Sequence, residues 1–199
     1  MKRLAVLLLM GTMALGTVAC GTMGQGTQQN SNVTITEANA ILTNVWEEYN
    51  ETASEDTKFD IFGGNMENMI MGTPEKFDAT LEGALDALAV SYCIPTDAIA
   101  MTDDIATMMH ARNANTFSGA AYHVTESANV QTVVDSIKNA TLNNQWMCGF
   151  PETLIIVTVG DDYVVSAFGN AQLIDTFKTA ITSVYGDMAD VVVEQALAR

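Results

Sequence analysis

The stretch "LIIVTVGDDYVVSAF", residues 154–168, is the clearest indication of the fold. Its first half, Leu154 to Val159, is a continuous run of aliphatic and mostly β-branched residues, which is typical of a buried strand. Gly and Asp at positions 160–162 favour a turn, and Tyr163 to Phe168 is a second apolar run. Two such runs joined by a short Gly/Asp loop predict an antiparallel β-hairpin.

Segments with helical periodicity lie on both sides of this hairpin. Apolar residues recur every three to four positions over residues 37–51, 129–140 and 171–185, which predicts three amphipathic helices. The final segment, residues 188–197, is also amphipathic, and we expect it to close the chain as a helix.

The middle of the chain is less regular. Asp103 or Asp104 could cap a helix that runs to about Ala114, and residues 118–126 resemble a strand. Gly and Pro interrupt residues 56–75, which we expect to be irregular or to form short extended pieces. The order of elements predicts an α+β fold. Its small antiparallel sheet would have about three strands, including the hairpin, with several helices packed on one face.

The first residues have the layout of a secretory signal peptide. "MKRLAVLLLMGTMALGTVAC" begins with two basic residues, continues with an apolar stretch and ends in small residues. The segment before Cys20 resembles a bacterial lipobox, although Thr17 stands where Leu is preferred. We therefore expect residues 1–19 to be removed and Cys20 to be lipidated. The alternative is ordinary cleavage after Ala19, which would release a secreted protein.

A flexible tether and one domain are expected after the signal peptide. Residues 20–32 are rich in Gly, Gln, Thr and Asn and carry no charge, so they cannot bury enough surface to fold. Residues 33–199 have the length of a single domain. We expect this domain at the extracytoplasmic face of the cell membrane, anchored through the lipid.

The charge balance excludes some partners. The full chain has a net charge of −16, and without Lys2 and Arg3 it has six basic and 24 acidic residues, or −18. Such a chain cannot neutralise phosphates, so we do not expect it to bind nucleic acid. The same charge disfavours docking on anionic lipid headgroups.

The loop "QWMCGFPE", residues 145–152, superficially resembles a thioredoxin redox loop. Dithiol catalysis needs a second cysteine two residues further on, at the start of a helix, and here Cys148 is followed by Pro151 and a predicted strand. Cys93 and Cys148 are the two thiols left once Cys20 is lipidated, and they could form a disulfide. The alternative is two free cysteines that act as small apolar residues.

No other pattern indicates catalysis or a cofactor. Thioether and imidazole ligands suit Cu(I), which makes weak candidates of Met66, Met69, Met71, Met108, Met109 and His110. Buried or partner-facing methionines are far commoner, so we expect no metal and a structural role for His110 and His123. The paired acids, including Asp103-Asp104 and Asp161-Asp162, are interpreted as charged surface. A binding surface near Trp146, Phe150 and Tyr163 is possible, but we favour core positions for these residues.

Three segments carry a family resemblance: "MMHARNANTFSGAAYHV", "NNQWMCGFPETLIIVTVGDDYVVSAFG" and "LIDTFKTAI". Over roughly residues 60–186 the chain resembles uncharacterised extracytoplasmic lipoproteins of clostridia-like Gram-positive bacteria, a domain of unknown function. The resemblance implies a cell-surface protein and supplies no catalytic residues.

We therefore expect a non-enzymatic binding or interaction module with a protein or small-molecule partner. The alternative is a redox or metal-handling accessory protein, of the kind labelled as a bacteriocin-export accessory, which would use the thiols or the Met/His residues.

Overall fold

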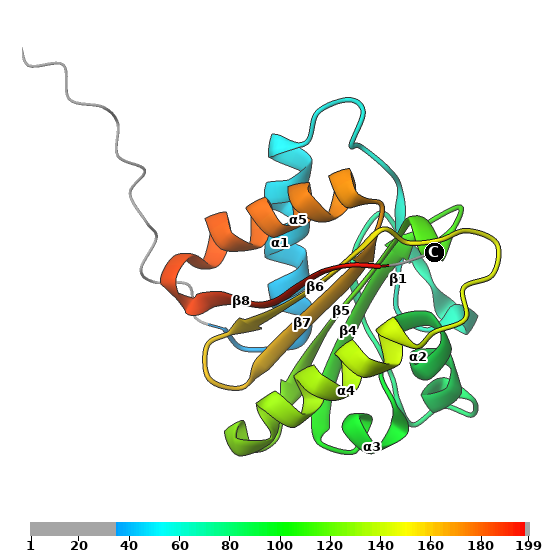
Figure 1. The fold of residues 1–199 in the computed structure, drawn as a ribbon, viewed down its shortest axis with the longest axis vertical. Helices are drawn as coiled ribbons and strands as arrows, with labels where there is room; N and C mark the ends of the chain where they lie inside the picture. The colour runs from blue at the N-terminus through cyan, green and yellow to red at the C-terminus, as the bar shows by residue number, and fades with distance from the viewer. Residues whose placement is uncertain (1–34, 198–199) are drawn as a thin grey trace, which may run out of the picture.

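The described residues, 35–197 of a computed structural model, form one eight-stranded antiparallel sheet (Figure 1). The strand order is β2-β1-β4-β5-β7-β6-β8, and β3 pairs with β4 beside β1. The strands are β1 (Ile61–Gly63), β2 (Ile70–Met71), β3 (Glu75–Lys76), β4 (Thr102–His110), β5 (Phe117–Val124), β6 (Thr153–Val159), β7 (Tyr163–Gly169) and β8 (Ala189–Ala196). The predicted signal peptide, the predicted tether and Cys20 lie outside the described residues.

Helices cover both faces of the sheet (Figure 1). They are α1 (Ala38–Thr52), α2 (Ala84–Tyr92), α3 (Thr96–Ile99), α4 (Val130–Leu142) and α5 (Ala171–Tyr185), and four short 3₁₀ turns occur between elements of the described chain. The two longest helices, α1 and α5, lie side by side on one face, which we call the α1/α5 face. The other three lie on the opposite face, which we call the α2–α4 face.

The predicted hairpin is confirmed as β6 and β7. Val159 pairs with Tyr163 across the turn, and the register continues to Thr153 opposite Gly169. Every residue of β7 is buried, because the strand lies between β5 and β6 and has helices above and below it. Burial on both faces explains why this part of the sequence is continuously apolar rather than alternating.

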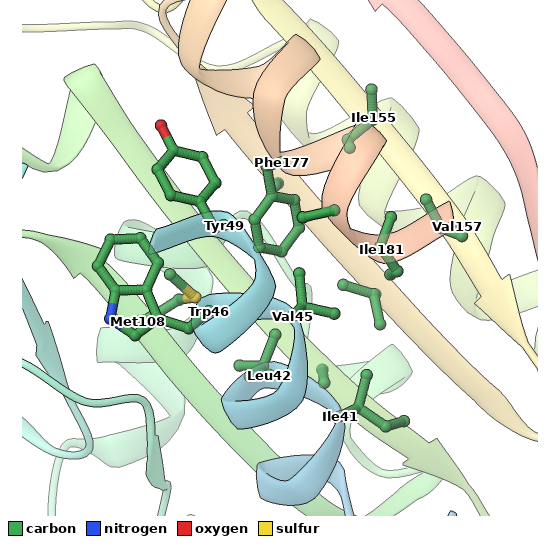
Figure 2. Close-up of a cluster of buried hydrophobic side chains, with 14 of the residues drawn as sticks. Ile41, Leu42, Val45, Trp46, Tyr49, Met108, Ile155, Val157, Phe177 and Ile181 are labelled. Carbon is green, nitrogen blue, oxygen red and sulfur yellow. The ribbon is translucent and has the colours of Figure 1, made fainter. Parts of the chain in front are cut away.

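The α1/α5 face has a core of aliphatic and aromatic side chains (Figure 2). Alternate residues of each strand point to this face, as the two-residue period of a strand requires. They meet the apolar stripes of the helices, including Val45 of α1 and Ile181 of α5. A connected group of rings crosses the layer, with centroid separations of 5.1–5.6 Å between neighbours. Its members are Trp46, Tyr49, Phe59, Phe117 and Phe177.

The α2–α4 face has a core of different composition. Leu88, Ile94 and Ile137 are fully buried there against the sheet. Several polar side chains are buried among them, namely Tyr92, Thr107, Tyr122, Thr141 and Ser166. The hydroxyls of Tyr92 and Tyr122 have no hydrogen-bond partner within residues 35–197. This layer therefore combines apolar packing with buried hydroxyls, and two of these hydroxyls have no hydrogen-bond partner in the described residues.

The fold class α+β is confirmed, but the prediction of about three strands is wrong. Residues 102–110 form the strand β4 rather than a helix, and residues 189–196 form the strand β8 rather than a closing helix. The segment 56–75 contributes β1 and β2, and β3 follows directly. The resulting sheet is wide enough to need helices on both faces, where we expected them on one.

Candidate functional site

A pocket of about 550 Å³ opens beside the first half of β4, and we call it the Asp103 pocket. Its apolar lining consists of Phe77, Ala79, Ile99 and Ile105, and its polar lining consists of Lys76, Asp78, Thr80, Thr102 and Asp103. Pockets for small organic ligands have volumes of roughly 300–1,000 Å³ and a similar mixture of apolar surface with a few polar groups. The Asp103 pocket therefore has the size and composition of a small-molecule site.

The end of a short strand creates this pocket. β3 ends at Lys76, and one more backbone bond, from Phe77 N to Ile105 O at 2.8 Å, continues its pairing with β4. Beyond that bond the chain leaves the edge of β4 as the segment 78–80. The pocket lies between this departing segment, the start of β4 and the end of α3.

A β-bulge places Asp103 at the pocket. Thr102 pairs with Val124, and Asp104 pairs with His123, so Asp103 is the extra residue of β4. A bulge changes the direction of side chains locally and is common beside functional sites. Here it allows Asp103 to line the pocket on the α2–α4 face while its carboxylate reaches His123 of β5.

His123 is bonded to two carboxylates. Its Nδ1 lies 2.5 Å from Asp103 Oδ1, and its Nε2 lies 3.3 Å from Asp162 Oδ2 in the β6–β7 turn. The ring also packs against Tyr163, with centroids 4.9 Å apart. The hydrogen bond with Asp103 is the largest cause that raises the pKa of His123, and Asp162 adds to it against the opposing effect of partial burial. The pair favours the imidazolium form.

Asp104 points away from the pocket. Its Oδ2 accepts a hydrogen bond of 2.7 Å from the backbone N of Ala38, at the start of α1, and no side chain caps that helix locally. Its Oδ1 lies 3.0 Å from Lys76 Nζ. Asp104 therefore supplies a helix cap from across the fold and a partner for Lys76, whose pKa its hydrogen bond raises.

Asp78 presents a second carboxylate at the pocket. Its Oδ1 accepts hydrogen bonds from Thr80 N at 2.9 Å and Thr80 Oγ1 at 2.6 Å. The Thr80 side chain, followed by its backbone N–H, lowers the pKa of Asp78. The carboxylate is therefore ionised near neutral pH.

From the sequence, Cys93 and Cys148 could either form a disulfide or remain free, and both are free in the structure. Cys93 is buried at the end of α2, where Asn144 Nδ2 lies 3.5 Å from its Sγ, and burial raises its pKa to about 11. Cys148 is exposed in the loop before β6. Asn113 and Asn115 donate side-chain hydrogen bonds to carbonyls of this loop. Cys93 and Cys148 are therefore not bonded to each other, and within residues 35–197 Cys148 has no thiol partner.

The structure does not bring the Met and His candidates for copper together. Met108 is fully buried on the α1/α5 face, whereas its neighbour Met109 packs on the α2–α4 face. His110 stacks on Phe59, and its Nδ1 accepts backbone N–H groups. The other three candidates, Met66, Met69 and Met71, lie around the 3₁₀ turn η1 (Met66–Asn68) and β2, where Met66 and Met71 are exposed.

The aromatic residues that we considered for a binding surface also separate. Trp146 packs against Phe168, and Phe150 is exposed near it. Tyr163 is buried beside His123, at the opposite end of β7. Two smaller hollows, of about 140 and 160 Å³, occur near Met66 and near Gly149, and both are smaller than a typical ligand pocket.

Sequence analysis missed Asp78, Lys76 and the role of Asp103. We interpreted Asp103-Asp104 as a helix cap or charged surface, and the bulge instead directs the two side chains to different partners. His123 was correctly expected in a strand. Its partners are 20 and 39 residues away, so spacing along the chain carried no signal for them.

Comparison with known proteins gave no matching family model, no similar curated protein and no similar solved structure. Within residues 35–197, no group of three or more His, Cys, Asp or Glu side chains could bind a metal ion. The helices of the same range are all too short or too polar to span a bilayer. The argument for function therefore depends on the geometry of the Asp103 pocket.

Proposed function

We propose that this chain is a non-enzymatic binding protein of the cell surface, anchored through a lipid on Cys20, and that it binds a small molecule in the Asp103 pocket. The observation that carries the proposal is the pocket itself, which combines about 550 Å³ of space with an apolar lining and several charged side chains. The lipobox-like sequence before Cys20 supports the location.

The geometry of His123 favours binding over catalysis. A general base needs a ring nitrogen within hydrogen-bond reach of the proton that it removes. Both ring nitrogens of His123 are already bonded to carboxylates, those of Asp103 and Asp162. The imidazole thus serves to position Asp103 at the pocket and has no free nitrogen for a substrate.

The anchoring is tested by fractionating a Gram-positive host that expresses the full chain. We expect the protein in the membrane fraction and labelled by a clickable fatty acid. Cys20→Ala should abolish the label and release the protein, whereas the matched control Cys148→Ala should remain membrane-bound. Equal membrane retention of unlabelled Cys20→Ala would contradict the lipid anchor.

Ligand binding is tested by a thermal-shift screen of small organic molecules with the purified chain. A ligand that binds only the folded state raises Tm by mass action. We expect Ala79→Trp, which fills the pocket, to remove this shift, and Val90→Trp, at an exposed position of α2, to leave it unchanged. Absence of any stabilising compound would contradict the proposal. So would turnover of a generic esterase, peptidase or glycosidase substrate.

A further inference from the structure

We propose that the ligand of the Asp103 pocket is an organic cation, in which an amine or quaternary ammonium group is joined to an apolar body. This inference rests on the proposed function, since it names the ligand class of the same pocket. The charges at the pocket carry the inference, because some of them already have a partner of opposite charge and others do not.

The single basic residue of the lining is already neutralised. Lys76 Nζ lies 3.0 Å from Asp104 Oδ1, and Asp104 belongs to the other face of the sheet rather than to the lining. Within residues 35–197, Asp78 has no basic partner, and its hydrogen bonds come from the neutral Thr80. The lining therefore presents unmatched negative charge beside apolar surface.

The charge of the whole molecule favours the same ligand. The chain carries −16 overall, and its acidic residues are distributed along the sequence. A field of this sign raises the local concentration of cations and lowers that of anions. An anionic ligand would have to displace Asp104 from Lys76. A cation can contact Asp78 without displacing a basic partner, and it can contact Asp103 in competition with His123.

The apolar lining determines the rest of the ligand. Phe77, Ile99 and Ile105 come from three different segments and line one pocket, with Phe77 and Ile105 nearly fully buried. Such a surface can cover a ring or a branched alkyl group, and its burial from water contributes to affinity in proportion to area. A bare metal ion or ammonium would leave this surface unused.

His123 adds a dependence on pH, because it competes with the ligand for Asp103. The groups that face its ring are Asp103 from β4, Asp162 from the β6–β7 turn and Tyr163 from β7. When His123 is protonated, its positive charge offsets that of the Asp103 carboxylate. When it is neutral, that compensating charge is absent, and the Asp103 carboxylate attracts a cationic ligand more strongly.

The test compares three probes that share one ring: benzyltrimethylammonium, benzyl alcohol and phenylacetate, which are cationic, neutral and anionic. Titration of the ¹⁵N-labelled chain followed by NMR should show the cation binding tightest, with shifts at residues 76–80 and 102–105. Asp103→Asn and Asp78→Asn should each lower the affinity for benzyltrimethylammonium about fivefold, as expected for a partly exposed charge pair. Asp161→Asn, the same charge change on an exposed turn residue outside the lining, should have no such effect.

A pH series isolates the role of His123, because benzyltrimethylammonium keeps its charge at all pH values. Its affinity should increase as pH rises through the pKa of His123, which lies above the ordinary 6.5. His123→Gln should make the affinity independent of pH over this range. If the affinity of the unaltered chain for benzyltrimethylammonium does not change with pH, His123 does not compete with the ligand for Asp103.

The outcomes distinguish failure of the cationic ligand class from failure of the proposed binding function. If benzyl alcohol or phenylacetate binds at the pocket as tightly as the cation, the ligand class is wrong and the binding function stands. If none of the three probes shifts residues of the pocket, while the thermal-shift screen finds a ligand whose effect Ala79→Trp removes, the ligand class is wrong and the binding function stands. If the screen also finds no ligand, both fail.

Discussion

The two faces of the sheet are built differently. On the α1/α5 face, two helices of 15 residues each cover a layer of aliphatic side chains and connected aromatic rings. On the α2–α4 face, helices of 9, 4 and 13 residues cover a layer with buried hydroxyls and the thiol of Cys93, and the Asp103 pocket opens at its edge. The α1/α5 face is thus closed by two long helices, whereas the shorter helices of the α2–α4 face leave the Asp103 pocket open at its edge.

The largest effect is expected from Phe177→Ala. Phe177 is fully buried on the α1/α5 face and packs edge-on against Phe117 at 5.3 Å. Loss of the ring removes apolar contacts and leaves a cavity, which should lower the free energy of unfolding by about 3–5 kcal/mol. Urea denaturation followed by circular dichroism measures this. Val192→Ala, on the partly exposed strand β8, is the control and should cost less than about 1 kcal/mol. Similar losses of unfolding free energy for the two variants would show that the buried ring of Phe177 contributes no special stability to the α1/α5 face.

A second large effect is expected in the rates at which the two thiols, Cys93 and Cys148, are alkylated. The pKa of Cys93 is about 11, because it is buried beneath the α2–α4 face, whereas Cys148 is exposed. Because the thiolate is the reactive form, the raised pKa and the burial of Cys93 should slow its alkylation by about a hundredfold or more. Intact mass during iodoacetamide treatment without reductant should show one rapid addition and one that requires denaturant. Absence of any addition, even after unfolding, would show that the thiols are bonded to each other.

A matched pair of tyrosines sharpens the contrast between the faces. The Tyr49 hydroxyl, on the α1/α5 face, donates a 2.7 Å hydrogen bond to Thr57 O, so Tyr49→Phe should cost about 1–2 kcal/mol of unfolding free energy. The Tyr122 hydroxyl has no hydrogen-bond partner in residues 35–197, although Ser166 lies near it. Tyr122→Phe should therefore be neutral or stabilising. The same urea experiment compares them, and an equal loss for both would contradict the assignment.

The smallest effect concerns the pH dependence of stability. The pKa of His123 in the folded chain is raised, first by its hydrogen bond to Asp103. A raised folded pKa gives stabilisation that is fully present below the unfolded value, near 6.5, and is lost as pH rises through the folded value. Because Asp103 is largely exposed, we expect only a few tenths of a kcal/mol. The difference in unfolding free energy between the chain and His123→Gln should shrink across this range. A difference that grows with pH would contradict a raised pKa of His123 in the folded chain.

The parts of the fold that local patterns could predict are those with one strong periodicity. The hairpin was recognisable because its two apolar runs flank Gly-Asp-Asp, and α1 and α5 because their apolar stripes are continuous. β4 was mistaken for a helix because Asp103 and Asp104 precede four consecutive buried residues, which point to both faces of the sheet and show no alternation. In β8 the three successive valines at 191–193 favour a strand, and our interpretation, which was based on amphipathic spacing alone, did not use this signal.

The candidate site was less predictable because it depends on tertiary contacts. The Asp103 pocket joins residues 76–80 with residues 99–105, and its space arises where β3 stops pairing with β4. The bulge that directs Asp103 arises from the register in which β4 pairs with β5. The sequence of either strand alone does not specify that register. His123 could be placed on its strand, but its carboxylate partners required the folded arrangement.

The bulge at Asp103 also bears on how such a protein can diversify. Through His123 it links the pocket to Asp162, a residue of the β6–β7 turn that lies outside the pocket lining. Surface turns accept sequence changes more readily than packed strands. Substitutions in this turn can therefore retune the carboxylate at the pocket while the lining itself stays unchanged. Under the proposed function, selection would have two separate points of adjustment: the lining, for the shape of the ligand, and the β6–β7 turn, for the charge of the Asp103 carboxylate.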